Sequence, residues 1–366
     1  MILIEDNILL SFINITSNVL IINQGGERMT LDALKKSFYQ IKGKTIALVY
    51  TFQGDTSNGL EHFFIWKSKI LSKWMIAVED LHCLPLILDV RTFIDKAING
   101  TLPNVDFVLN LNTGTFDLSV MALVPSTCSA LGIPCIPCNA VSIVTGENKL
   151  LSNLIAESIG LHVPKNVPEN ESSGIFRPIN LGNSLGVKRG FDNITYNGIY
   201  QEFISGYEIT TPAVYNNITG KMDLLPTVMY LPDNKDLDWY NGEEVKKKRL
   251  GYSFRLVNLE DKLKEKYLNL INTLSIQTFC RIDARVKCSE DIFFNSSYNM
   301  VLDENTYFIE INVMPTIRDN NNFVYSFQSV SENDSLYPCI TTQRDSFGDV
   351  NVYSFLLASS MMSFLN

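Results

Sequence analysis

The sequence predicts an α/β protein whose C-terminal half has an α+β arrangement. Apolar residues make up 46% of the 366 residues and charged residues 19%, so a sizeable core is expected and wholesale disorder is excluded. Residues 46–140 alternate short apolar runs with helix-like segments, which is typical of an open parallel sheet. Residues 207–366 instead combine strands with strongly periodic helices. At about 150 residues per domain, this length allows two or three domains.

The first 140 residues divide into an extension and a regular α/β region. Residues 1–45 form the extension, with strand-like clusters at Ile8–Ile13 and Val19–Ile22 and a turn at Gly25-Gly26. In residues 46–140, four apolar runs are interpreted as strands: Ile46–Tyr50, Leu84–Asp89, Val105–Asn110 and Ile133–Ile136. The helical segments between them are one that runs through Trp66 and Trp74, then Arg91–Ile98 and Leu118–Leu131.

A helix and short strands are predicted for residues 141–206. Leu151, Leu154, Ile155 and Ile159 share one helix face, and Gly160 supplies the stop. The predicted strands that follow are Ile175–Ile179, Val187–Arg189 and Tyr200–Ile204.

The C-terminal region begins with strands and loops in residues 205–255. A strong helix then runs from about Leu259 to Ile276, with Leu263, Tyr267, Leu270 and Leu274 at helical spacing. Two further strands are predicted at Phe279–Val286 and Tyr307–Val313. The uncharged stretch Val350–Asn366 is short and polar for a membrane span, so we expect a last helix packed on the body.

Charge and termini exclude several classes of protein. The net charge is −9, and the longest basic run is Lys246–Arg249, so a nucleic-acid binder is not expected. The N-terminus lacks a basic region followed by an apolar one, which predicts no signal peptide. We therefore expect a cytoplasmic protein that does not engage a membrane.

Seven cysteines are scattered through the chain, mostly in apolar surroundings. An odd number at this low density is unlike a disulfide scaffold, so buried reduced thiols are expected. Cys135-x-x-Cys138 is a single CxxC without a second pair, so a zinc or redox role is the minor alternative.

The two strands at Phe279–Val286 and Tyr307–Val313 carry the most informative polar residues. Residues two apart in a strand point to the same face. Arg281, Asp283 and Arg285 therefore share a face, opposite Ile282, Ala284 and Val286. In the second strand, Glu310 and Asn312 share a face, opposite Ile309, Ile311 and Val313.

If these strands pair, Asp283, Glu310 and Asn312 converge. Hard oxygen ligands of this kind suit Mg²⁺, with Mn²⁺ as an alternative, and water and phosphates would complete the shell. Arg281 beside them would neutralise a phosphate or a developing oxyanion. A solvated sheet face with surface ion pairs is the alternative interpretation.

An ordered series of short motifs precedes these strands. It comprises Leu131-Gly-Ile-Pro134, Lys149 at a helix start, Gly160–Pro164, Arg177-Pro178, Gly182-Asn-Ser-Leu-Gly186 and Gln201–Glu208. Each motif alone is weak, but the set, ending in Arg-x-Asp and Glu-x-Asn-x-x-Pro, is far more specific. It resembles the ATP-grasp superfamily, and within it the D-alanine–D-alanine ligase-like enzymes, over about residues 46–330.

The resemblance implies an ATP-grasp fold with three parts after the extension. These are an N-terminal parallel α/β domain (46–140), a reduced central lid (141–206) and a C-terminal catalytic domain (207–366). The gaps from Pro164 to Arg177 and from Gly186 to Gln201 are short for the family's lid. The gap from Asp283 to Glu310 is long, which suggests an inserted hairpin or loop.

The resemblance also implies roles for individual residues. Lys149 and Arg177 would contact nucleotide phosphates, although Arg177 replaces the family's usual lysine. The Gly182–Gly186 loop, with Asn183 and Ser184, would cover the phosphates. The adenine side would be Gln201–Ile204, including Glu202 and Ile204, and Glu208 would hold the ribose hydroxyls. For Lys149 and Glu208, a plain surface role stays open.

Two residues are candidates for binding substrate. The segment after Pro315 lacks the Gly- and Ser-rich turn of true D-alanine–D-alanine ligases, which argues against D-alanyl-D-alanine as the product. Arg318 in that segment is a candidate for holding a substrate carboxylate. Glu61 is a candidate for the first substrate's amine, and a plain helix-start acid is the alternative.

The function that the resemblance implies is ATP-dependent ligation of a carboxylate to an amine through an acyl phosphate. The substrates would be amino acids or small peptides, Arg281 would stabilise the intermediates, and the products would be ADP, phosphate and an amide. A ligase for a non-amino-acid acid shares every ATP-side residue. A nucleotide-binding regulatory or scaffold protein without turnover is the runner-up. The resemblance also favours a homodimer.

Overall fold

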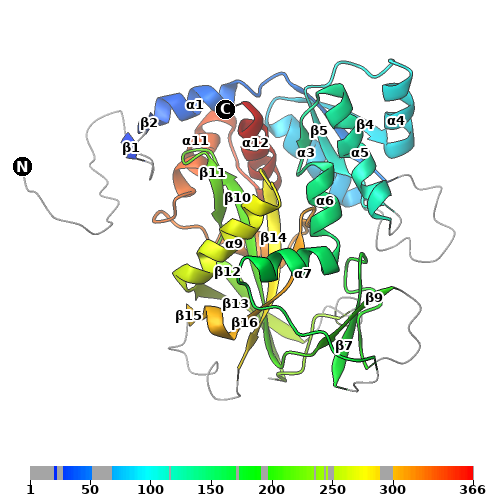
Figure 1. The fold of residues 1–366 in the computed structure, drawn as a ribbon. Helices are drawn as coiled ribbons and strands as arrows, with labels where there is room; N and C mark the ends of the chain where they lie inside the picture. The colour runs from blue at the N-terminus through cyan, green and yellow to red at the C-terminus, as the bar shows by residue number, and fades with distance from the viewer. Residues whose placement is uncertain are drawn as a thin grey trace, which may run out of the picture.

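The computed structural model describes residues 20–22, 28–51, 68–114, 117–169, 173–190, 197–234, 236–242, 245, 251–288 and 300–365. Three sheets and their helices make up the body of the molecule, and a two-stranded hairpin of β1 (Leu20–Ile22) and β2 (Arg28–Thr30) precedes them (Figure 1). Glu61 and the Ile8–Ile13 cluster lie outside the described residues.

The N-terminal sheet is parallel, as the alternation of runs predicts. Its order is β4-β3-β5-β6. The strands are β3 (Thr45–Tyr50), β4 (Leu84–Asp89), β5 (Phe107–Leu111) and β6 (Cys135–Ile136). The helices that connect and cover them are α3 (Ser68–Asp80), α4 (Val90–Ile98) and α5 (Leu118–Leu131).

Both faces of this sheet are apolar, because parallel sheets bury both sides. Ile46 and Leu48 face a core that includes α3, whereas Ala47 and Val49 face the core of α4 and α5. The two later helices begin at acidic caps: Asp89 accepts the N–H groups of Arg91 and Thr92, and Asp117 accepts that of Ser119.

The C-terminal sheet is larger and mostly antiparallel. Its order is β15-β13-β12-β10-β14-β16, and β11 also pairs with β10. Its strands are β10 (Gly206–Asn216), β11 (Lys221–Leu224), β12 (Thr227–Pro232), β13 (Tyr252–Leu259), β14 (Phe279–Lys287), β15 (Met300–Val301) and β16 (Thr306–Asn312). One face packs on α9 (Asp261–Thr273) through Leu263, Tyr267 and Leu270. These are the residues whose spacing predicts the helix.

A third, small sheet lies beside the C-terminal one, at the lower right of Figure 1. Its order is β8-β7-β9, and it is built from β7 (Gly174–Pro178), β8 (Lys188–Arg189) and β9 (Gly198–Glu202). Helices α6 (Ala140–Gly146) and α7 (Lys149–Ser158) precede it. The Asn148 side chain caps α7 by accepting the N–H groups of Leu150 and Leu151, so Lys149 opens that helix as predicted.

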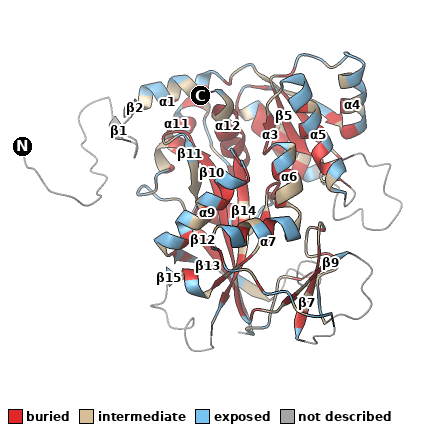
Figure 2. Ribbon diagram, viewed as in Figure 1, coloured by how far each residue is buried: buried red, intermediate tan, exposed pale blue. Residues whose placement is uncertain are grey.

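The last helix, α12 (Val352–Leu365), is a central part of the core, as Figure 2 shows. It contacts α3 and β10, and thereby joins the N-terminal and C-terminal sheets. Helices α1 (Leu31–Tyr39), α10 (Asn322–Gln328) and α11 (Tyr337–Phe347) were not predicted from the sequence.

All seven cysteines are free thiols, and six are buried, as expected. Within the described part of the chain, none of the helices has the length and apolar character that a membrane crossing requires.

Helix α7 buries only part of the face that its apolar periodicity suggests. The buried positions are Lys149, Ser152, Asn153 and Ala156, while the side chain of Leu154 is 54% exposed. The apolar periodicity is thus overridden because α7 packs against β16 with Lys149 directed into a pocket. The sequence pattern located the helix correctly, and Ile155 and Ile159 of the predicted face pack against the core, but Leu151 and Leu154 are exposed.

Candidate functional site

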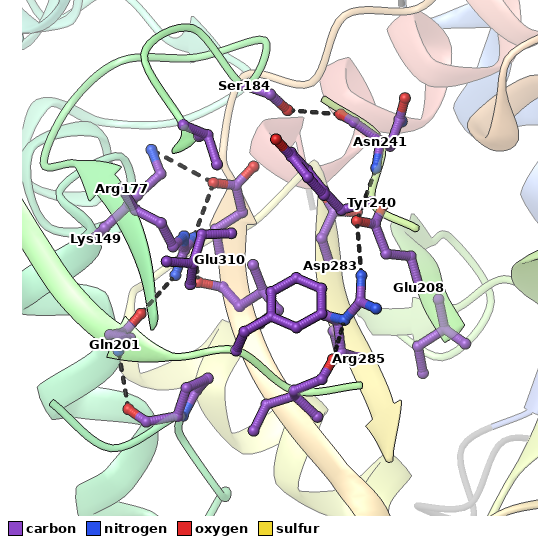
Figure 3. Close-up of a pocket in the computed structure, with 18 of the residues that line it drawn as sticks. Lys149, Arg177, Ser184, Gln201, Glu208, Tyr240, Asn241, Asp283, Arg285 and Glu310 are labelled. Atoms are coloured by element: carbon purple, nitrogen blue, oxygen red, sulfur yellow. Dashed lines mark hydrogen bonds and ion pairs between the residues drawn. The ribbon is translucent and has the colours of Figure 1, made fainter. Parts of the chain in front are cut away.

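A pocket opens between the small sheet and the polar face of the C-terminal sheet. Strands β7 and β9 contribute Ile175, Arg177 and Gln201 to its lining, and β10, β14 and β16 supply the opposite wall. The loop at residues 181–187 and the segment Tyr240–Asn241 close it from the remaining sides (Figure 3).

One row of side chains crosses the floor of this site. Strands β14 and β16 pair antiparallel, which is the condition under which Asp283 and Glu310 were expected to converge. Asp283 lies opposite Glu310, and Thr210 of β10 lies opposite Asp283 on the other side. Side chains opposite each other in an antiparallel pair share a face. The two carboxylates and the hydroxyl therefore lie next to one another on the pocket side, while Ile282 and Ile311 are buried behind them.

Asp283 is held by three neighbours. The Arg281 guanidinium grips its carboxylate, with Nε 3.0 Å from Oδ1 and Nη2 2.6 Å from Oδ2. Thr210 Oγ1 donates to Oδ1 at 2.7 Å, and Asn312 Nδ2 donates to Oδ2 at 2.9 Å. Burial lowers the pKa of Arg281, but the facing Asp283 carboxylate outweighs this and the pKa ends well above its usual value. Arg281 is therefore a fixed cation at the pocket.

Glu310 faces two buried cations. Its Oε2 lies 3.4 Å from Lys149 Nζ and 3.3 Å from Arg177 Nη2. Lys149 is 6% exposed and Arg177 4%, so both charges are shielded from water. Arg177 Nη2 also donates to the Ile309 carbonyl at 2.8 Å, and Arg177 Nη1 to Gln201 Oε1 at 3.1 Å. Burial lowers the pKa of the Arg177 guanidinium, and the Glu310 carboxylate opposes this shift.

A further carboxylate, Glu147, lies behind this wall. Its Oε1 accepts the backbone N–H of Val313 at 3.0 Å and of Met314 at 3.4 Å, which ties the end of β16 to the α6–α7 junction. Burial raises the pKa of Glu147 to about 7, with Lys149 acting to lower it and Glu310 to raise it. Sequence reasoning missed this residue, because no motif marks it.

The other end of the pocket is organised by Arg285. Its guanidinium donates to Glu208 Oε1 at 3.2 Å and to four backbone carbonyls, among them those of Ile204 and Gly206. The Phe203 ring lies under two arginines, 3.7 Å from Arg189 and 4.7 Å from Arg285. An aromatic ring with flanking cations is a suitable surface for a flat, electron-rich ligand.

The Gly182–Gly186 loop bends over the pocket. Asn183 and Ser184 both adopt positive φ, at 57° and 60°, in a region that residues with side chains rarely enter. Ser184 Oγ donates to the Asn241 carbonyl at 2.9 Å, and the Asn241 N–H donates to Glu208 Oε1 at 3.0 Å. The loop is thus connected to the Arg285 end of the pocket.

Most of the residues singled out in the sequence lie together here. The lining includes Lys149, Arg177, Ser184, Glu202, Ile204, Glu208, Arg281, Asp283 and Glu310. Asn312 is not in the lining but contacts both carboxylates, 2.9 Å from Asp283 and 3.5 Å from Glu310. Asn183 and Arg318 are not among the lining residues. Arg318 is exposed, and the structure does not bring it to the pocket.

One predicted orientation is wrong. The sequence alternation places Ile309 on the buried face, but the register shifts between Asp283 and Ala284, and Phe308 takes the buried position instead. This β-bulge turns Ile309 to the pocket lining. Tyr230, Tyr240 and Asn241 also line the pocket without a sequence signal, whereas Thr210 shares the strand face of Glu208 and was predictable by alternation.

Comparisons with known proteins agree with this architecture. A D-alanine–D-alanine ligase from Bacillus anthracis complexed with ATP superposes with a TM-score of 0.55 at 16% identity, over 83% of this chain and 98% of that one. The VanG D-Ala:D-Ser ligase from Enterococcus faecalis gives 0.54 at 13% identity, over 82% and 100%. D-alanyl-alanine synthetase A from Vibrio cholerae gives 0.55 at 14% identity, over 84% and 99%.

No family model matches the sequence, and no curated protein matches it. The structural likeness shows the fold, which is the ATP-grasp fold of the D-alanine–D-alanine ligases, as the resemblance in the sequence predicts.

Proposed function

We propose that this chain, with its ATP-grasp fold, is an ADP-forming carboxylate–amine ligase. The observation that carries the proposal is the row of Glu310 and Asp283 on one sheet face, with Lys149, Arg177 and Arg281 directed at it from one pocket. Lys149, Arg177 and Arg281 concentrate three cations at this row, in a protein whose net charge is −9. A polyanionic substrate fits such a site.

ATP would lie with its phosphates near Lys149 and Arg177. Both cations now contact Glu310, and an incoming phosphate would exchange for that carboxylate as their partner. The nucleobase would lie toward Phe203 and Ile204, where a ring and a backbone edge line the pocket. Glu208 at that end is our candidate for the ribose hydroxyls.

The predicted metal site fits Mg²⁺ by the chemistry of its donors. Asp283, Glu310 and Asn312 are mutual neighbours; the two carboxylates would supply oxygens directly, and the Asn312 amide, which now directs Nδ2 at both of them, would have to turn over to supply its own. Among the described residues, no group of three or more His, Cys, Asp or Glu is placed to hold a metal, so this set would supply part of a shell and water and phosphates the rest. Bound there, Mg²⁺ would neutralise phosphate charge during transfer.

The reaction proceeds in two balanced steps. A carboxylate oxygen of the first substrate attacks the γ-phosphorus of ATP, the bond to ADP breaks, and an acyl phosphate forms. The amine of the second substrate then attacks the acyl carbon, loses a proton, and expels phosphate to leave an amide. In this proposal Arg281 would hold the substrate carboxylate and would stabilise the oxyanion of the second step. Substrates of amino-acid or small-peptide size are proposed.

Coupled ADP and phosphate release tests the proposal. Purified protein with MgATP should release both only when an acid and an amine are supplied, and an amide should form in equal amount. Glu310→Gln should lower turnover about 10²–10³-fold, by analogy with a lost transition-state contact, while the fold stays intact. Nucleotide binding without release across an amino-acid-pair panel would instead support a regulatory protein that has lost turnover.

A further inference from the structure

Tyr230 of β12 contributes a hydroxyl group to a pocket wall that is otherwise rich in charge. Its side chain is buried. Burial raises the pKa of Tyr230 well above its usual value, with Arg281 acting to lower the pKa and Asp283 and Glu208 acting to raise it. The hydroxyl group therefore keeps its proton at neutral pH and can donate a hydrogen bond.

A hydrogen bond that Tyr230 accepts limits where this proton can point. Asn322 Nδ2 lies 2.6 Å from the Tyr230 hydroxyl oxygen and 3.0 Å from Thr210 Oγ1. Asn322 Oδ1 accepts the backbone N–H of Phe323 at 2.8 Å, so the amide presents its nitrogen to the two hydroxyl groups. An amide nitrogen donates and does not accept. The Tyr230 oxygen is therefore the acceptor, and its own hydrogen points elsewhere.

The bonds around Thr210 agree with this direction. A hydroxyl group carries one hydrogen, and Thr210 donates it to Asp283 Oδ1 at 2.7 Å. Thr210 must then accept from Asn322, as Tyr230 does. Because Asn322 is 3% exposed, water does not compete for its two amide hydrogens. One buried amide thus fixes both hydroxyl groups, and the network leaves the Tyr230 proton unused.

Arg281 also has donors that its ion pair does not use. Its Nε and Nη2 contact the Asp283 carboxylate. Within the described part of the chain, neither Arg281 Nη1 nor the Tyr230 hydroxyl has a hydrogen-bond acceptor. Of the charged groups around Tyr230, Arg281 has the largest effect on its pKa, ahead of Asp283 and Glu208. Both residues line the same pocket, so the two donors serve one region of it.

A cationic donor and a neutral donor together suit an anionic oxygen ligand. Each oxygen of a carboxylate accepts hydrogen bonds and neither donates, so a carboxylate can satisfy both groups at once. A carboxamide of the same shape has only one oxygen, and its N–H groups cannot accept from the second donor.

We propose that the Tyr230 hydroxyl group is a second donor, beside Arg281, to the carboxylate of the acid substrate. Tyr230 is then a catalytic residue of the ligase, because the same bond would persist on the oxyanion that forms when the amine adds. This inference rests on the proposed ligase function and adds a residue to its acid-binding site.

Calorimetric binding of an acid and its carboxamide tests the inference. The probe is chosen from a panel of amino acids in both stereochemical series. It is the one that forms the most hydroxamate with MgATP and hydroxylamine, because hydroxylamine traps the acid whose carboxylate is activated. This amino acid and its carboxamide are each titrated into protein saturated with Mg²⁺ and a non-hydrolysable ATP analogue.

Tyr230→Phe keeps the ring and removes the hydroxyl group alone. We expect this variant to bind the acid about tenfold or more weakly, because a hydrogen bond to a charged group is lost. Its affinity for the carboxamide should change by less than about twofold, since a hydrogen bond between neutral groups is roughly half as strong. Loss of the acid's preference over its carboxamide is a result that general damage to the pocket would not give.

Tyr252→Phe is the matched control. It removes a hydroxyl group from a ring whose centre lies 5.2 Å from that of Tyr230 but which is not among the lining residues, so both affinities should stay unchanged. Thermal denaturation verifies that both variants are folded.

Three results with Tyr230→Phe would overturn the inference and leave the ligase proposal intact. They are an unchanged affinity for the acid, an equal loss for acid and carboxamide, and a loss confined to the ATP analogue. Absence of hydroxamate with every amino acid would overturn the proposed ligation of amino acids, and this inference with it.

Discussion

Glu310 pairs with Lys149 and Arg177, two cations that are almost fully buried. Burying these charges costs desolvation free energy, which a role in binding would explain. Burial lowers the pKa of Arg177, and the Glu310 carboxylate opposes that shift. Removing one partner of a buried pair leaves the other uncompensated. We therefore propose that Lys149 and Arg177 exchange Glu310 for a phosphate when a nucleotide binds.

Arg177→Ala should weaken ATP binding about tenfold or more, because a charge-assisted hydrogen bond contributes on the order of 1.5–3 kcal/mol. Arg177→Lys should retain most of the affinity, since it keeps the charge. Lys44→Ala is the matched control, because it removes a cation that pairs with Asp106 beside the N-terminal sheet. Calorimetric titration with MgATP gives the affinities, and an unchanged dissociation constant for the alanine variant would contradict the phosphate assignment.

Glu147 predicts a pH dependence of stability. Its pKa rises from 4.5 to about 7 on folding, so the folded state binds the proton more tightly. The resulting stabilisation is fully present below pH 4.5 and is lost as the pH rises through about 7. Relative to Glu147→Gln, the wild type should lose up to about 3 kcal/mol of unfolding free energy across this window. Urea denaturation at a series of pH values measures this, and parallel stability curves for the two proteins would contradict it.

At the scale of elements, side chains alternate along strands β14 and β16, so that one face of the sheet carries the pocket residues and the other face carries core residues. Ile282 and Ile311 lie opposite each other and are buried, while Asp283 and Glu310 share the pocket face. The same strands thus carry the core on one side and the site on the other.

Ile311→Asp should unfold the protein, because Ile311 is 1% exposed and an unpaired charge would be placed in the core. Glu310→Gln is the control, since it changes the adjacent pocket-facing side chain and should remain folded. Circular dichroism and thermal denaturation compare the two. An Ile311→Asp protein as stable as the wild type would refute the assignment of faces.

Alternation located this site because its key residues lie on two regular strands. It failed at Ile309, where the register shift reverses the side-chain direction and no local pattern marks a bulge. Helical periodicity gave only part of the buried face of α7, which also includes Lys149 and Ser152 because the helix borders the pocket. In both cases the direction of the side chain is decided by strand pairing or packing with residues that are distant in the sequence.

At the scale of the molecule, the site exists only where separate parts meet. Arg177 comes from the small sheet, Lys149 from α7 and Glu310 from the C-terminal sheet. Sequence motifs listed these residues in order, but Tyr230, Tyr240 and Asn241 join them through the tertiary fold alone. Arg318 shows the converse, since a plausible position in the chain did not bring it to the pocket.

Because the pocket is shared by several parts, a nucleotide should stabilise the whole chain. A ligand that binds only the folded state adds about 2.7 kcal/mol at a hundredfold excess over its dissociation constant. We expect MgATP to raise the melting temperature by several degrees, and GTP at the same concentration to do so less. Differential scanning fluorimetry measures both, and no shift with millimolar MgATP would count against a nucleotide site.

The most direct test of the central claim follows an oxygen atom. If the carboxylate attacks the γ-phosphorus and the acyl phosphate then yields to the amine, one carboxylate oxygen must leave in the phosphate. With the amino acid that gives the fastest turnover, labelled with ¹⁸O in its carboxylate, phosphorus NMR should show one ¹⁸O in the released phosphate. Unlabelled phosphate would mean that water, and not the substrate carboxylate, attacks ATP, and would contradict the ligase mechanism.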